Sequence, residues 1–222
     1  MDHRRHRKPA PPAPILIAGG GIGGLTLALS LHERGIPCIV LEAAKEVRQL
    51  GVGINTLTNA IRELAALGLL PALDAIAIRT RELRYLDRFG NRIWTEARGL
   101  HAGHDSPQLS IHRGRMHGVL WQAAMERLGP QAVRTGMRLV GFAQSGTSVT
   151  ANFADGSSIR GSALIGADGI HSMLRATLHP ADPGIRWNGI QMWRGAIEWP
   201  AYETGDVMFV AGDMKEKLVF YP

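Results

Sequence analysis

The fold is decided by residues 15–30, ILIAGGGIGGLTLALS, in which a short apolar run is followed by glycines and then by a second apolar run. The first four residues predict a buried strand, and the second run predicts a helix that ends at Gly35. Another apolar strand, residues 38–41, follows and ends at Glu42. Strand, glycine turn, helix, strand and acid in this order are typical of a dinucleotide-binding βαβ unit.

The glycines fit the pattern G-x-G-x-x-G, and each has a physical role. Gly19 allows the sharp turn, Gly21 lets the main chain approach a pyrophosphate, and Gly24 lets the helix pack close to the strand. The helix N-terminus offers unpaired N–H groups and a positive dipole end to phosphates. Glu42 is placed to accept both hydroxyls of a ribose. This motif alone does not distinguish NAD from FAD.

The composition is that of a globular protein. Of 222 residues, 45% are hydrophobic and 20% are charged, so a sizeable core is expected. A single cysteine, Cys38, excludes an internal disulfide and a cysteine-based zinc site, and a reducing, cytoplasmic setting is expected. The formal net charge is +6, and about half of this excess lies in residues 1–14, a proline-rich stretch expected to be a disordered tail. This distribution argues against specific nucleic-acid binding.

The N-terminus also has features of a signal peptide or membrane anchor, because a positive stretch precedes the largely apolar residues 15–31. Glycines within those residues disfavour a continuous helix, and no small-residue cleavage site follows. No other stretch approaches the length needed to span a bilayer. The sequence therefore predicts no membrane association.

Two later segments distinguish between the dinucleotides. Residues 166–172, GADGIHS, follow another apolar strand, 163–165, and precede a helix that contains Arg175. With their flanking residues they resemble the Asp-Gly motif of the class A flavin monooxygenases, the flavoprotein aromatic hydroxylases. Residues 110–120, SIHRGRMHGVL, resemble the other hallmark of that family, an arginine at a helix start that contacts FAD, here Arg113.

The resemblance extends over nearly all of residues 15–222. Residues 50–70 resemble the loop and helix after the flavin-binding acid, residues 82–94 predict a hairpin, and residues 189–195, GIQMWRG, resemble the entry to the substrate-domain sheet. The branch most similar is salicylate-hydroxylase-like and, more narrowly, resembles the monooxygenases that act on 5-methylphenazine-1-carboxylate. The implied fold class is α/β, a Rossmann-like FAD-binding domain with an incomplete β-sheet substrate domain, of p-hydroxybenzoate-hydroxylase type.

This resemblance implies FAD as cofactor, NADH or NADPH as cosubstrate, and O2 with a small aromatic phenazine-type or benzoate-type compound as substrates. In the family a flavin C4a-hydroperoxide delivers the oxygen, so no catalytic side chain is expected. The expected cofactor-binding residues lie in or beside the motifs above: Gly19, Gly21, Ile22, Gly23, Gly24, Glu42, Ala43, Val52, Arg113 and Asp168.

The expected substrate residues are Trp193, which would stack on a planar ring, and Arg194, which would pair with a carboxylate. In the alternative interpretation, Met192 and Trp193 alternate into the core of the substrate sheet and Arg194 is solvated. Arg48 is a weaker candidate for contact with FAD phosphate or NAD(P)H, and a solvated loop arginine is the alternative.

The predicted FAD-binding domain comprises residues 15–80 and 105–180, and the predicted partial substrate domain comprises residues 81–104 and 185–222. Members of the family are roughly twice as long and carry a second FAD-contacting motif, Gly-Asp followed by small residues and His. This sequence lacks that motif, and its last residues read as a strand of the substrate sheet. The chain is therefore expected to be the N-terminal part of such an enzyme.

Two other functions stay open. An NAD-binding dehydrogenase of ordinary Rossmann type would share the first motif but is not expected to carry the element at 163–175. A remnant that binds nucleotide without turnover would share every motif. Among nine histidines, His101 and His104 form an H-x-x-H pattern without acidic or cysteine companions, so no metal site is expected. His171 lies on the turn of the Asp-Gly motif and is expected to be solvent-exposed, with an approach to the cofactor as the alternative.

Overall fold

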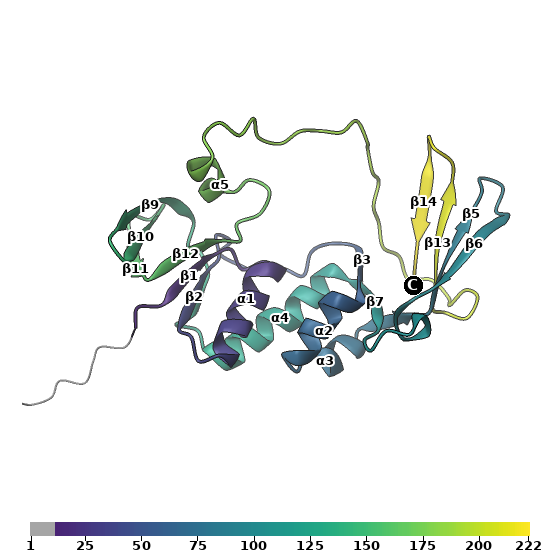
Figure 1. The fold of residues 1–222 in the computed structure, drawn as a ribbon, viewed down its shortest axis with the longest axis horizontal. Helices are drawn as coiled ribbons and strands as arrows, with labels where there is room; N and C mark the ends of the chain where they lie inside the picture. Colours follow the sequence, from purple (N-terminus) through teal and green to yellow (C-terminus); the bar gives the residue numbers. More distant parts are fainter. Residues whose placement is uncertain (1–11) are drawn as a thin grey trace, which may run out of the picture. The chain divides into compact units, whose positions relative to one another are not determined.

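The computed structural model describes residues 12–222, which divide into two compact units (Figure 1). The first unit contains the described residues up to Val47 together with Ala124–Arg186, and the second contains Arg48–Ala123 and Trp187–Pro222. Each unit is therefore assembled from two separate stretches of chain. The tail expected at residues 1–14 lies, except for its last three residues, outside the described part.

A parallel sheet with strand order β12-β1-β2-β8 forms the centre of the first unit. Its strands and the helix between the first two of them are β1 (Ile15–Ala18), α1 (Ile22–Glu33), β2 (Cys38–Leu41), β8 (Val133–Arg134) and β12 (Ala163–Gly166). Ile15 pairs with Cys38 on one side and with Ala163 on the other. The predicted βαβ unit is confirmed, and β1 is the strand that holds the two halves of the sheet together.

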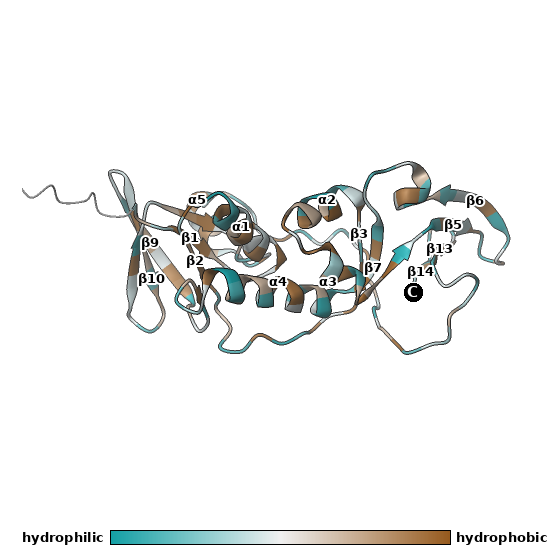
Figure 2. Cartoon of the chain, turned by 90° about the horizontal axis from the view of Figure 1, so that it is seen from below, coloured by the Kyte–Doolittle hydropathy of each residue, from teal (hydrophilic) through white to brown (hydrophobic). Residues whose placement is uncertain are grey.

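A three-stranded antiparallel sheet, β11-β10-β9, packs against the parallel one. Its strands and the helix that follows are β9 (Leu139–Ser145), β10 (Ser148–Phe153), β11 (Ser158–Gly161) and α5 (Met173–Leu178). Ala151 and Phe153 from β10 form a buried cluster with Leu16 and Leu41, and the adjacent strands β1 and β2 are coloured as apolar in Figure 2. Buried residues alternate along β10, and they place the core between the two sheets.

The second unit contains an antiparallel sheet with strand order β3-β7-β4. Its elements are β3 (Gly53–Thr56), α2 (Thr58–Ala66), α3 (Leu70–Asp74), β4 (Ala77–Thr80), β7 (Gln108–His112) and α4 (Arg113–Leu128), and the division between the units falls within α4. Leu109 and Ile111 of β7 are buried and project to one face. On the other face Ser110 Oγ lies 2.8 Å from Thr80 Oγ1 and donates to Asn55 Oδ1 at 3.0 Å, so the buried hydroxyls are hydrogen-bonded.

A second sheet in this unit has the strand order β14-β13-β5-β6. Its strands are β5 (Glu82–Leu86), β6 (Arg92–Ala97), β13 (Val207–Gly212) and β14 (Lys217–Phe220), and the 3-10 helix η1 (Gly99–Ala102) follows β6. β5 and β6 form the predicted hairpin, and Asp87 fixes its turn because Oδ1 accepts hydrogen bonds from the backbone N–H groups of Phe89 and Asn91.

The entry to a sheet expected at residues 189–195 is a wrong prediction, because the first strand after α5 is β13, which begins at Val207. Met192 and Trp193 do not alternate into a sheet core, since their exposed fractions are 70% and 87%. Gly184 and Gly189 have positive φ angles, which interrupt an extended strand. An apolar segment forms a strand only where a neighbouring strand is available to pair with it.

The division into compact units groups residues 48–80 and 105–123 with the hairpin and the C-terminal strands. It does not say which residues bind FAD or substrate, so the boundaries expected for the FAD-binding and substrate domains stay a prediction. Among residues 12–222, no helix is both long enough and apolar enough to cross a bilayer.

Truncating the core side chain of Leu16 tests the packing of the first unit. We expect Leu16→Ala to lower the free energy of unfolding by about 2–5 kcal/mol, because a fully buried leucine leaves a cavity. Val140→Ala on β9 is the control, since Val140 is 55% exposed. Urea titration followed by circular dichroism measures both variants, and equal losses would contradict this account of the core.

Candidate dinucleotide site

Three segments far apart in the sequence meet at the carboxyl edge of the parallel sheet. Gly19 follows β1, Glu42 follows β2, and Ala167 follows β12. The Gly19 N–H donates to Leu41 O at 2.8 Å, and the Ala167 N–H donates to Ala18 O at 2.8 Å. Because α1 leads from β1 to β2 while β12 lies on the other side of β1, this edge is a topological switch point, the usual place for a ligand in an open α/β sheet.

Two of the motif glycines are required by close backbone packing. Gly19 has a φ of +107°, and a Cβ built on it would lie 2.3 Å from the carbonyl oxygen of Ala167. A Cβ on Gly24 would lie 2.0 Å from the carbonyl oxygen of Gly19. The turn after β1 therefore fits between α1 and the segment after β12 only because both positions are glycine.

The third motif glycine, Gly21, is exposed and packs against nothing. A Cβ at Gly21 would have no atom within 4 Å, and the same holds for Gly23 in the first turn of α1. Gly21 is the N-cap of α1, no side chain caps this helix, and its first turn contains no acid. Ile22, half-buried, is its first residue. The backbone N–H groups in the first turn of α1, those of Ile22 and Gly23, are therefore available to an anion.

The carboxylate of Glu42 is held in place by backbone donors. Its Oε2 accepts a hydrogen bond from the Gly20 N–H at 2.7 Å, and its Oε1 accepts one from the Ala44 N–H at 2.7 Å. Its main chain is also fixed, because the Glu42 N–H donates to Arg134 O and its carbonyl accepts from the Met137 N–H. Both oxygens keep further lone pairs for a ligand hydroxyl.

Asp168 is also fixed by a helix. Its Oδ2 accepts hydrogen bonds from the N–H groups of Met173 at 3.0 Å and Leu174 at 3.4 Å, at the start of α5. Ser172 Oγ accepts from the Arg175 N–H at 2.9 Å and completes this cap. Asp168 is therefore held at the edge of the sheet, on the β12 side.

A pocket of about 310 Å³ joins these groups. It is lined by Ala18, Gly19, Gly21, Leu41, Glu42, Ala43, Met137, Arg138, Leu139, Ala167, Asp168, Gly169, His171 and Met173. The structure thus brings together five of the expected cofactor-binding residues, whereas Ile22, Gly23 and Gly24 belong to α1 behind this lining. Sequence reasoning missed Met137, Arg138 and Leu139. Their only signal was their position directly after the short strand β8.

Val52 and Arg113, the other expected FAD contacts, meet in the second unit. The Arg113 N–H donates to Val52 O at 2.9 Å. A Cβ on Gly114 would lie 2.4 Å from backbone atoms of Gln49, and one on Gly118 would lie 2.7 Å from Gln49 Nε2. Two glycines one helical turn apart thus let the loop before β3 lie directly on α4. Sequence reasoning missed this contact.

The two expected substrate residues have different surroundings. Arg194 Nη2 donates to Gly53 O at 2.8 Å, at the start of β3, so Arg194 is not only solvated. Trp193, next to it, is 87% exposed. Arg48 is also exposed. Residues 12–222 contain no group of three or more His, Cys, Asp or Glu side chains that could hold an ion.

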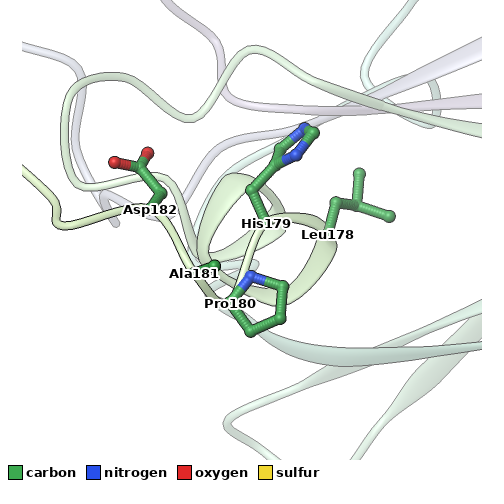
Figure 3. A pocket seen from close by; sticks show the side chains of 5 residues that line it. All are labelled: Leu178, His179, Pro180, Ala181 and Asp182. Atoms are coloured by element: carbon green, nitrogen blue, oxygen red, sulfur yellow. The ribbon is translucent and has the colours of Figure 1, made fainter.

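A second pocket lies at the end of α5 and is lined by residues 178–182 (Figure 3). Five consecutive residues form it, so a ligand there would contact a single turn of chain. Asp182 pairs with Arg175 at 3.4 Å. Its polar side chains, His179 and Asp182, come from the same turn and do not converge from separate elements, so the pocket is not a candidate site.

Comparison with known proteins agrees with this geometry. The profile of a family described as FAD binding domain matches residues 12–211. Phenazine 1,6-dicarboxylic acid hydroxylase PhzS of Lysobacter antibioticus is 48% identical over 94% of the chain, and 3-hydroxybenzoate 6-hydroxylase 1 of Aquipseudomonas alcaligenes is 35% identical over 82%. The matches cover 53% and 47% of those proteins, so the chain spans about half the length of the curated relatives it matches.

Solved structures give the same result. The crystal structure of Klebsiella pneumoniae HpxO complexed with FAD and uric acid has a TM-score of 0.76 and 26% identity, and the match covers 94% of the chain and 53% of that protein. The fold class expected from the sequence is therefore confirmed.

Two neighbouring glycines of α1 give a matched test. We expect Gly24→Ala to lower the free energy of unfolding by about 1–3 kcal/mol, because the new methyl group collides with the carbonyl of Gly19. Gly23→Ala in the same helix has open space and should leave stability unchanged or slightly raised. Thermal unfolding compares them, and similar melting temperatures would disprove the close contact.

Proposed function

The chain belongs to the FAD-binding-domain family, and from this premise we propose that it binds the adenosine diphosphate half of FAD across the carboxyl edge of the β12-β1-β2-β8 sheet. The observation that carries this proposal is that Gly21 and Glu42 line one pocket. The first offers open backbone at a helix N-terminus, and the second offers an oriented carboxylate. Phosphate and ribose need these two groups.

The residues of the first unit fit the cofactor part by part. The pyrophosphate would lie at the first turn of α1, where the N–H groups of Ile22 and Gly23 meet the helix dipole. A side chain at Gly21 would fill this space. Glu42 would accept the two ribose hydroxyls, with Ala43 beside it, and Asp168 would face the chain that leads to the flavin.

In the second unit, Arg113 and Val52 would contact the remainder of the cofactor. Arg113 is exposed at the first turn of α4, and the glycine contact with Gln49 keeps the loop of Val52 against that turn. The guanidinium can donate to acceptor atoms of the cofactor, and its charge is always present. This assignment rests on the resemblance and on the Arg113–Val52 hydrogen bond.

The activity that we propose is hydroxylation of an aromatic compound with NAD(P)H and O2. Bound FAD supplies the redox chemistry, so the residues of the chain only bind, orient and exclude water. Both hydroxylases named above carry an aromatic carboxylic acid in their names. Trp193 has a free aromatic face, and Arg194 keeps donors beyond its bond to Gly53, so these two residues are our candidates for an aromatic acid.

Retention of FAD by the purified chain tests the proposal. We expect flavin absorbance to co-elute with a compact protein peak in gel filtration, because hydrogen bonds from the chain's own backbone orient the carboxylates of the pocket. A compact peak free of flavin would contradict FAD binding. Oxidation of NAD(P)H with aromatic acids is a separate measurement on the same sample, and it distinguishes an enzyme from a protein that only holds nucleotide.

Removing the ribose contact gives a quantitative test. We expect Glu42→Ala to weaken FAD binding about tenfold or more, because the two hydrogen bonds to a charged acceptor are lost. Glu126→Ala, an exposed position on α4 outside the pocket, changes the net charge equally and should leave affinity unchanged. Flavin fluorescence titration measures both variants. Unchanged affinity in Glu42→Ala would remove Glu42 from the site.

A further inference from the structure

One charged side chain of the pocket has no role in the account above. Arg138 lines the pocket and is exposed, and its guanidinium makes no hydrogen bond or ion pair with any other residue between 12 and 222. Arg84, Arg98 and Arg127, in contrast, each pair with a glutamate. Arg138 is therefore available to a ligand.

The backbone around Arg138 is firmly held beside Glu42. The Gly136 N–H donates to Ala44 O at 2.9 Å, and the Met137 N–H donates to Glu42 O at 2.8 Å. On the other side, the Ala154 N–H donates to Arg138 O at 2.9 Å, where β9 begins. The position of its Cα is thus fixed from both directions, and only the side chain is free to adapt.

The strand order determines which part of a dinucleotide lies near Arg138. From one side of the sheet to the other, the strands are followed by Asp168 (β12), Gly21 (β1), Glu42 (β2) and Arg138 (β8). In FAD the pyrophosphate is bonded to the ribose and the ribose to adenine. With the pyrophosphate at Gly21 and the ribose at Glu42, the adenine lies beyond Glu42, on the β8 side. A phosphate would lie two strands away from Arg138.

We propose that the guanidinium of Arg138 stacks on the adenine ring of FAD and makes this chain selective for the dinucleotide over FMN. The inference rests on the proposed function. A planar guanidinium is weakly hydrated and packs on aromatic faces, whereas an ammonium group lacks that plane. Met137 and Leu139, the neighbours of Arg138 in the chain, also line the pocket and add apolar surface to it.

The test uses the 222-residue chain, three ligands and three variants. FAD, ADP and FMN are titrated by calorimetry against the wild type, Arg138→Ala, Arg138→Lys and Arg160→Ala. Arg160 is the matched control, because it is an exposed arginine of the same unit on β11, outside the pocket. We expect Arg138→Ala and Arg138→Lys to weaken FAD and ADP by the same factor, about three- to tenfold. FMN affinity and the Arg160→Ala variant should not change.

The other outcomes overturn the inference in distinct ways. Full affinity in Arg138→Lys means that charge alone acts, and an equal loss of FMN affinity means that the contact is with the phosphate or flavin. An equal loss in Arg160→Ala means a general effect of net charge. If wild type binds ADP with the expected Arg138 dependence but does not retain FAD, the contact of Arg138 with adenine stands, whereas the proposed binding of FAD and the selectivity over FMN fail. If neither FAD nor ADP binds, both fail.

Discussion

The dinucleotide site depends on one close contact of the main chain. At Gly19 the backbone lies against the carbonyl of Ala167 and against Gly24, and no side chain fits there. At 2.3 and 2.0 Å from the nearest oxygen atoms, added carbons do not fit at Gly19 and Gly24. This contact aims the start of α1 at the carboxyl edge of the sheet, and it brings the segment of Asp168 to the same edge. The positions of the helix dipole and of the second carboxylate follow from it.

The two carboxylates of the pocket are held by hydrogen bonds from the chain's own backbone. Glu42 accepts two backbone hydrogen bonds, and Asp168 accepts two from the start of α5. Their side chains are already restricted, so a ligand that uses them loses less conformational entropy on binding. In the second unit, glycines fix the position of a loop, since Gly114 and Gly118 let the loop of Gln49 lie on α4 next to Arg113.

Sequence alone predicted the elements that local chemistry determines. The βαβ unit and the hairpin of β5 and β6 are encoded within short windows by apolar period, glycine and turn residues. Sequence could not place Arg138 beside Glu42, because that neighbourhood depends on the pairing of β2 with β8, two strands far apart in the chain. It also mispredicted residues 189–195 as the entry to a sheet, since an apolar pattern does not reveal whether a partner strand exists.

The strand order has a consequence for how the first unit is made. Ile15 pairs with Cys38 across one short helix, but its other neighbour is Ala163, which a ribosome adds much later. Throughout that interval, β1 has one edge without its partner, and the turn at Gly19 lacks the carbonyl of Ala167 against which it packs. Pairings so distant in sequence are slow to form. The motif recognised first along the chain is therefore among the last to reach its final shape.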